Sequence, residues 1–209
     1  MDKKITARIV HLPETYEMAY RIARQIQDTG EDYDVVVGIS RGGLPPSRIM
    51  CDFLNIKTLT TMQILHYESA AKAREEVRVS DPVKIDLEGR NVLLVDDVND
   101  SGDTLQAAVK HIQTLKPSLL KTAVLHEKAG SSFSVDYCGS YLSEWKWLIY
   151  QWAVTEDLIG FLERDGMLDS EPADAIRHLS EKYDLTVERD LLEKVLSMKE
   201  FYSKKDTSS

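Results

Sequence analysis

The sequence predicts an α/β protein in which a mainly parallel, twisted sheet is flanked by helices. Residues 34–39 (DVVVGI) and 91–95 (NVLLV) are continuous apolar runs, which are typical of strands buried on both faces. Each run leads into a polar, glycine-containing turn and then into a segment with helical periodicity. That order is typical of the strand–helix units of a parallel sheet. A chain of 209 residues has room for one such domain and a small appendage.

The other segments up to residue 152 fit the same architecture. Further strands are predicted at residues 5–12, 57–65 and 121–127, and helices at 13–28, from Pro45 and Pro46 onward, and from Thr104 onward. Residues 135–141 and 145–152 form a strongly aromatic segment. Residues 66–82 (HYESAAKAREEVRVSDP) are highly charged and lack a sustained apolar face. They are expected to form either a mobile loop over a ligand or a solvated hairpin.

The last fifty residues have a different character. Apolar spacing predicts three short amphipathic helices, at residues 155–166, 171–183 and 187–202. We therefore expect a domain at 1–154, a helical extension at 155–202 and a disordered tail at 203–209. Acidic residues occur throughout the extension without a basic stripe, which favours a packing or oligomerisation role over DNA binding.

Composition narrows the possible functions. The formal net charge of −9 argues against a general nucleic-acid-binding protein. The longest apolar runs are far below the roughly 18 residues of a membrane span, and no signal-peptide pattern opens the sequence, so a cytoplasmic location is expected. Cys51 and Cys138 have no metal-ligand spacing and are expected to be small buried hydrophobic residues in a reducing compartment.

A ligand site is expected immediately after the strand at 91–95. Open α/β sheets bind ligands at the carboxyl ends of their strands, and residues 96–103 should form a loop there. The backbone N–H groups and hydroxyls of residues 100–104, at the start of a helix, suit a phosphate monoester. Asp96 and Asp97 suit the two hydroxyls of a ribose, because ionised carboxylates only accept hydrogen bonds. The alternative is an acidic βα turn that is merely solvated.

The complete pattern, an apolar strand followed by two acidic residues and then D-S-G-x-T, resembles the phosphoribosyl-pyrophosphate (PRPP) signature of type I phosphoribosyltransferases. The resemblance implies their fold and a PRPP site, with Asp97 holding Mg²⁺ and Asp100 acting as general base for the purine. The PRPP-binding residues it implies are Asp96, Asp97, Asp100, Ser101, Gly102, Asp103 and Thr104. The glycine-rich loop after residues 34–39 resembles the pyrophosphate loop of the same family. It would use Ser40, Arg41, Gly42 and Gly43, with a cis peptide bond at Ser40–Arg41.

Two later segments resemble the base-binding side of the xanthine-guanine branch. HEKAG would place Lys128 to donate to a 6-oxo group, and WLIYQW would place Trp147 to stack on the purine, with the backbone of Leu148 beside it. The branch has Pro where this chain has Gln151 and an acidic residue where it has Ile149, so selectivity at the purine 2-position stays open. The aromatic alternation of Trp145 and Trp152 is more typical of a core or a dimer interface.

The expected activity is the conversion of a 6-oxopurine (xanthine, guanine or hypoxanthine) and PRPP to a nucleoside 5′-monophosphate and pyrophosphate. The resemblance also implies Mg²⁺ as cofactor, a homodimer, and a hood at residues 66–82 that closes over PRPP. Two alternatives stay open: a non-catalytic regulator of the same fold that senses PRPP, and an orotate or adenine enzyme. The HEKAG and WLIYQW segments speak against the second alternative.

Overall fold

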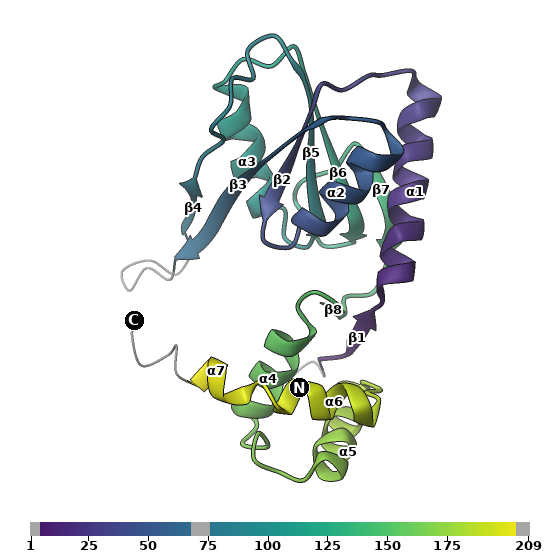
Figure 1. The fold of residues 1–209 in the computed structure, drawn as a ribbon, viewed down its shortest axis with the longest axis vertical. Helices are drawn as coiled ribbons and strands as arrows, with labels where there is room; N and C mark the ends of the chain where they lie inside the picture. Colours follow the sequence, from purple (N-terminus) through teal and green to yellow (C-terminus); the bar gives the residue numbers. More distant parts are fainter. Residues whose placement is uncertain (1–4, 68–75, 204–209) are drawn as a thin grey trace. The chain divides into compact units, whose positions relative to one another are not determined.

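The structure is a computed structural model that describes residues 5–67 and 76–203. These residues form two compact units: Pro13–Trp145, and the described parts of Met1–Leu12 together with Lys146–Ser209 (Figure 1). The centre of the predicted hood and the end of the predicted tail lie outside the described residues. Within the described ranges, no helix has both the length and the apolar character needed to cross a membrane.

The larger unit contains a six-stranded sheet and confirms the predicted α/β fold. The strand order is β4-β3-β2-β5-β6-β7, and only β4 is antiparallel to its neighbour. The strands are β2 (Val35–Ser40), β3 (Thr58–Tyr67), β4 (Glu76–Asp81), β5 (Asn91–Asn99), β6 (Leu119–Lys128) and β7 (Tyr137–Leu142). The accompanying helices are α1 (Leu12–Thr29), α2 (Leu44–Phe53) and α3 (Asp103–Gln113).

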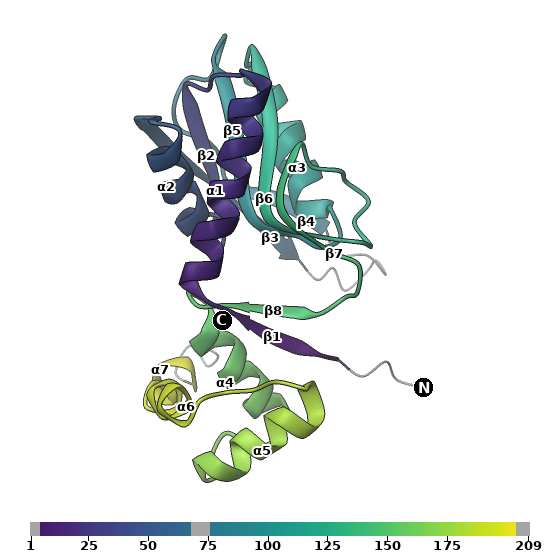
Figure 2. The same cartoon turned by 90° about the vertical axis from the view of Figure 1, so that its right-hand side faces the viewer.

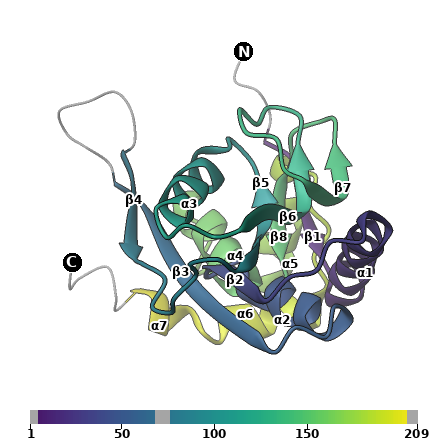
Figure 3. The same cartoon turned by 90° about the horizontal axis from the view of Figure 1, so that it is seen from above.

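The strand order places a ligand crevice between β2 and β5. The chain leaves β2 through α2 toward β3 on one side, and leaves β5 through α3 toward β6 on the other. Since the two crossovers run in opposite directions, their helices cover opposite faces, with α3 on one face and α1 and α2 on the other (Figure 3). The loops after β2 and β5 therefore meet where the strand order reverses, which is the usual binding position in such sheets.

One sequence prediction about this unit needs correction. Asp96 and Asp97 lie within β5 rather than in a loop, because β5 stays paired with β6 as far as Asn99. The described ends of residues 66–82 belong to strands, since β3 continues to Tyr67 and pairs with β4, as the hairpin alternative expected. Charged residues were compatible with these strands because an edge hairpin exposes one side to water.

The smaller unit combines the opening strand with the end of the chain. Strand β1 (Ala7–Val10) pairs in parallel with β8 (Trp147–Tyr150), and the two lie side by side in Figure 2. The helices that follow are α4 (Val154–Arg164), α5 (Pro172–Tyr183), α6 (Arg189–Leu196) and α7 (Lys199–Ser203). The C-terminal helices are thus confirmed, except that the third predicted helix is divided between α6 and α7. Their buried apolar faces share one core with residues of β1 and β8.

A buried carboxylate joins α4 to α5 in this unit. The Asp165 side chain is 3% exposed and accepts hydrogen bonds from Lys182, from His178 at 2.8 Å and from the Tyr183 hydroxyl at 2.6 Å. Burial favours the neutral form of Asp165. The hydrogen bonds from these three partners outweigh that effect and hold its pKa well below the ordinary value. Asp165 is therefore a charged junction between the two helices.

Replacing Asp165 with Asn is expected to lower the free energy of unfolding by about 2–3 kcal/mol, because the buried charge and one acceptor are lost while the cations stay partly solvated. Because the pKa is depressed in the folded state, the stabilisation is present above the ordinary pKa of about 3.9 and declines as pH falls below it. Urea unfolding of both proteins from pH 3 to pH 8 measures the difference. A constant difference down to pH 3 would contradict the role of the ionised carboxylate.

Candidate active site

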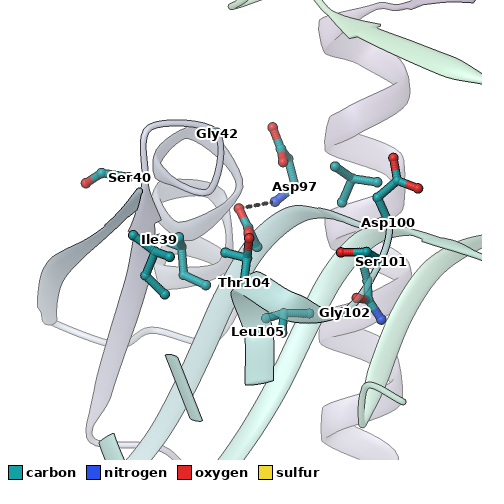
Figure 4. A pocket seen from close by; sticks show the side chains of 13 residues that line it. Ile39, Ser40, Gly42, Asp97, Asp100, Ser101, Gly102, Thr104 and Leu105 are labelled. Carbon is teal, nitrogen blue, oxygen red and sulfur yellow. Dashed lines mark hydrogen bonds between the residues drawn. The ribbon is translucent and has the colours of Figure 1, made fainter. Parts of the chain in front are cut away.

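A cavity of about 320 Å³ lies at the crevice between β2 and β5. The end of β2 contributes Ser40 and the loop after it contributes Gly42, and β5, the loop after it and the start of α3 supply most of the remaining wall. The residues from β5 to α3 that line the cavity are Asp96, Asp97, Val98, Asn99, Asp100, Ser101, Gly102, Thr104 and Leu105. The structure thus brings together most of the predicted PRPP and pyrophosphate residues (Figure 4).

The two adjacent carboxylates differ in their surroundings. Asp96 is 7% exposed, and its Oδ1 accepts a hydrogen bond from the backbone N–H of Asp97 at 2.9 Å. Burial, and next the neighbouring Asp97 charge, raise the pKa of Asp96 well above its ordinary value. Asp97 and Asp100 instead extend toward the open side of the cavity (Figure 4). Asp97 is therefore the better placed of the pair to meet a ligand.

The turn between β5 and α3 has the form of an anion site. Gly102 precedes α3 with φ +97°, a conformation that L side chains rarely adopt. The Ser101 hydroxyl donates to Asp103 Oδ2 at 2.8 Å, which fixes the first turn of the helix. The N–H groups of a helix start and its dipole favour a negatively charged ligand such as a phosphate. The phosphate role of residues 100–104 stays a prediction, and the geometry of this turn is compatible with it.

The loop at residues 131–133 forms hydrogen bonds with this turn and with the end of β5. Asn99, which is 2% exposed, donates from Nδ2 to the Phe133 carbonyl at 2.7 Å and accepts from the Ser131 hydroxyl at 2.9 Å. The backbone N–H and hydroxyl of Ser132 both donate to the Ser101 carbonyl, at 2.8 and 2.9 Å. Sequence reasoning missed these supporting residues, because their partners lie about thirty residues away along the chain.

The loop after β2 approaches β5 closely at two glycines. A Cβ atom on Gly42 would overlap the Asp97 carboxylate, and one on Gly43 would overlap the backbone carbonyls of Ile39 and Val95. The peptide bond Ser40–Arg41 is cis, as the resemblance implies. Only residues without a side chain allow this loop to pack against the strand that carries Asp97. Arg41 is exposed at the same turn.

Asp100 lies in a cluster with Lys128 and Trp145. The Lys128 ammonium donates to Asp100 Oδ2 at 2.6 Å, and the indole N–H of Trp145 donates to Oδ1 at 3.0 Å. The Lys128 Nζ also lies 4.6 Å from the centroid of the Trp145 ring. The Lys128 side chain is 4% exposed, whereas that of Asp100 is 47% exposed. The predicted base and the predicted donor therefore neutralise each other in this structure.

Trp145 was predicted for a core or interface, and the structure places it beside the two groups assigned to the purine. It is 40% exposed. Its contact with Asp100 spans 45 positions in the sequence, and alternation of aromatic residues alone gives no indication of it.

Trp147 and Leu148 lie on β8 in the smaller unit. Trp147 is 40% exposed, and Leu148 is 8% exposed. Ile149 is fully buried in the core of that unit, so the residue that replaces the family's acidic position has a packing role. The backbone N–H of Gln151 donates to the Val10 carbonyl at 3.1 Å, a hydrogen bond that proline could not make.

The residues at the cavity fit a magnesium ion that is shared with a substrate. Among the residues that the structure describes, no three His, Cys, Asp or Glu side chains form a cluster able to hold a metal by themselves. Mg²⁺ commonly retains several waters and binds one or two carboxylates together with substrate phosphates. Asp97, on the open side of the cavity, can supply such a carboxylate.

Replacing Gly102 with Ala is expected to weaken PRPP binding at least tenfold. The new Cβ would lie 2.7 Å from the Phe133 backbone nitrogen and would require an unfavourable positive φ, so the turn must shift. Gly130→Ala is the matched control, since nothing lies within 4 Å of a Cβ there. Calorimetric titration of PRPP measures both variants. Equal affinity of Gly102→Ala and the parent protein would contradict the assigned role of this turn.

Three comparisons with known proteins bear on this site. Residues 6–156 match the family described as the phosphoribosyl transferase domain. The chain is 30% identical over 135 residues to a xanthine-guanine phosphoribosyltransferase of Cereibacter sphaeroides, covering 65% of this chain and 77% of that protein.

Two solved structures have similar folds. A purine phosphoribosyltransferase from Pyrococcus horikoshii matches with TM-score 0.61 and 26% identity, covering 69% of this chain and 93% of that one. A hypothetical protein from Neisseria gonorrhoeae with bound ppGpp matches with TM-score 0.65 and 28% identity, covering 78% and 99% of the two chains.

The sheet, the glycine turn at its switch point and the acidic strand end place the chain among α/β proteins with a ligand crevice at the switch point of a mainly parallel sheet. The chain belongs to the phosphoribosyltransferase family, as the family match over residues 6–156 shows. The recognition made from the sequence motifs is therefore confirmed, and the relatives include xanthine-guanine enzymes.

Proposed function

We propose that the protein transfers the phosphoribosyl group of PRPP to a 6-oxopurine (xanthine, guanine or hypoxanthine), forming the nucleoside 5′-monophosphate and pyrophosphate. This reaction would serve purine salvage in the cytoplasm. The observation that carries the proposal is the contact of Lys128 with Asp100 next to the phosphate-type turn. It places a buried cationic donor and a half-exposed carboxylate at 2.6 Å from one another, beside the cavity.

The proposed mechanism divides the work among the chain's own residues. The turn at residues 100–104 binds the 5′-phosphate, Asp96 and Asp97 face the ribose, and the loop of Ser40, Arg41, Gly42 and Gly43 holds the departing pyrophosphate. The exposed Arg41 and the backbone of this loop would stabilise negative charge as it develops on the leaving group. When bound at Asp97, Mg²⁺ would neutralise further charge on the pyrophosphate.

The base side of the reaction requires the Lys128–Asp100 pair to separate. Lys128 then donates to the 6-oxo group, and Asp100 accepts the proton of the purine imidazole nitrogen. An ammonium group has no lone pair for a 6-amino group, so adenine should be a poor substrate. Trp147 is proposed to stack on the purine, with Leu148 beside it. The proposal also includes a hood at residues 66–82 that closes over PRPP. It further includes a homodimer, and light scattering would measure the oligomeric state.

A substrate screen tests the proposed function. Purified protein with PRPP and Mg²⁺ is given xanthine, guanine, hypoxanthine, adenine or orotate, and pyrophosphate release is followed. Turnover with one or more 6-oxopurines, and at least 100-fold less with adenine and orotate, is expected. Absence of turnover with every base would contradict the proposal.

A second candidate is a nucleotide-binding regulator without catalytic activity. The similar fold of the Neisseria gonorrhoeae protein with bound ppGpp favours its consideration. The screen distinguishes the two functions when it is combined with calorimetry of PRPP and ppGpp, because a regulator would bind one of them without releasing pyrophosphate.

A further inference from the structure

Two residues of α4 hold the indole ring of Trp147. The Trp147 indole N–H donates to Asp157 Oδ1 at 3.1 Å. The ring of Phe161 meets the Trp147 ring edge to face, with centroids 5.9 Å apart and planes inclined by 61°. Asp157 and Phe161 are four positions apart in the helix and therefore present their side chains to the same neighbour. These two contacts, one polar and one aromatic, help to fix the indole.

These contacts come from residues just beyond the family match. The family match ends at residue 156, and Asp157 is the next residue. Both residues that hold Trp147 therefore lie after the end of the family match. Strand β8, which carries Trp147, leads into α4 after only a short turn. Trp147 and its partners on α4 are therefore close in the sequence.

A residue of α5 also packs against Phe161. Phe161 is 5% exposed, and its ring stacks on Tyr183 with centroids 4.5 Å apart and planes inclined by 20°. Tyr183 is 1% exposed, and its hydroxyl donates to Asp165 at 2.6 Å. The aromatic series Trp147, Phe161 and Tyr183 therefore ends at the buried carboxylate that joins α4 to α5. A ring held in this way cannot rotate without disturbing packed side chains.

Part of the Trp147 side chain is exposed to solvent. The residue is 40% exposed although its N–H and one ring edge are engaged. A flat aromatic surface held in one orientation binds a planar partner with a smaller loss of side-chain entropy than a rotating one. Pairing of the N–H also removes a polar group that would otherwise require water at the edge of a stacked complex.

We propose that α4 and α5 support the purine-stacking surface, and that Asp157 is the positioning residue that sets the ring plane of Trp147. This inference rests on the proposed function, in which Trp147 stacks on a 6-oxopurine. It assigns a role to the C-terminal helices, which the family resemblance leaves unexplained. Asp157 acts through Trp147 and has no contact with the reacting atoms in this assignment.

A double-mutant cycle tests the proposal. The variants are Asp157→Ala, Trp147→Phe, which keeps a ring but lacks the indole N–H, and the two combined. Asp157→Ala is expected to raise the KM for the 6-oxopurine about five- to tenfold, with kcat and the KM for PRPP changed less than twofold. In the Trp147→Phe background the same substitution should have no further effect, because the hydrogen bond is already absent. Asp157→Asn, which retains an acceptor oxygen, should restore most of the base affinity.

Glu163→Ala is the matched control, since it removes an exposed carboxylate from the same helix. It should leave both KM values unchanged. An indole ¹⁵N–¹H spectrum gives a readout that does not depend on turnover: the Trp147 signal, assigned with Trp147→Phe, should move in Asp157→Ala and stay in place in Glu163→Ala.

The outcomes separate this inference from the proposed function. Absence of turnover by the unmodified protein with every base would contradict the proposed function, and this inference with it. Normal turnover combined with an unchanged base KM in Asp157→Ala would overturn the inference alone. Equal effects of Asp157→Ala with and without the Trp147 N–H, or equal rises in both KM values, would also overturn it.

Discussion

Replacing Asp100 with Asn is expected to lower kcat at least 100-fold while changing the affinity for PRPP less than about threefold. Asn has nearly the same shape and can still accept one hydrogen bond from Lys128 or Trp145, but it cannot take up a proton. Removal of a general base commonly costs a factor of about 10² to 10⁴. In the proposed function the turn binds the phosphate largely through backbone N–H groups, which the substitution leaves in place.

The measurement pairs steady-state kinetics with calorimetric titration of PRPP. Glu181→Gln, which changes an exposed carboxylate on α5 in the same way, is the control. A modest loss of stability is also expected in Asp100→Asn, because the buried Lys128 loses its counter-charge. Thermal unfolding should be followed for this reason. If PRPP affinity and kcat fall by equal factors in a folded variant, Asp100 has a positional role instead.

The elements that define this site were predictable because their signals are local. A buried strand, a turn rich in Gly and Asp, and a helix start all occur within residues 91–105. The φ of +97° at Gly102 explains why glycine occurs in that turn. In the loop after β2, glycine occurs for a different reason: a Cβ at either of its two glycines would overlap atoms of β5. The conformation at these positions is set by the residue type and by the strand directly before it, and both can be read from the sequence.

Contacts between distant segments were not predictable in the same way. The strand β5 extends to Asn99 because β6 offers it a partner, and the position of Asp96 and Asp97 changes accordingly. The pairing of β1 with β8 joins segments about 140 residues apart in the sequence, with Ile9 opposite Ile149. Alternation predicted a strand at residues 5–12, whereas residues 145–152 were predicted only as an aromatic segment of a core or interface. Neither pattern could indicate that the two segments pair with one another instead of joining the main sheet, since the period of a strand carries no information about its partner.

The two tryptophans show the same limit within a few residues. Trp145 and Trp147 have the same residue type and nearly the same exposure, but their N–H groups donate to Asp100 and Asp157 respectively. One is part of the cluster beside the cavity, and the other is held by the C-terminal helices. Alternation predicts that both lie on one side of an extended segment. What each one contacts depends on the elements that pack there.

Replacing Lys128 with Met is expected to raise the KM for the 6-oxopurine at least 30-fold, with PRPP affinity changed less than about twofold. Met fills a similar volume in the buried position but has neither a charge nor a donor for the 6-oxo group. A site that hydrogen-bonds a substrate group loses selectivity when its donor is removed, so the preference over adenine should also decline. Lys121→Met is the control. Lys121 lies on β6 as well, at the opposite end of the strand from Lys128, and it pairs with Asp136.

Stability distinguishes this prediction from general damage to the site. The Lys128–Asp100 pair is asymmetric, because the Lys128 side chain is 4% exposed and that of Asp100 is 47% exposed. Lys128→Met removes the buried charge and leaves a carboxylate that water can still solvate, so the melting temperature should be unchanged or higher. Asp100→Asn leaves the buried ammonium without a counter-charge, so it should be the less stable of the two. Thermal unfolding of both variants tests the order, and the reverse order would mean that Lys128 is solvated in the free protein and is not the buried donor that base recognition requires.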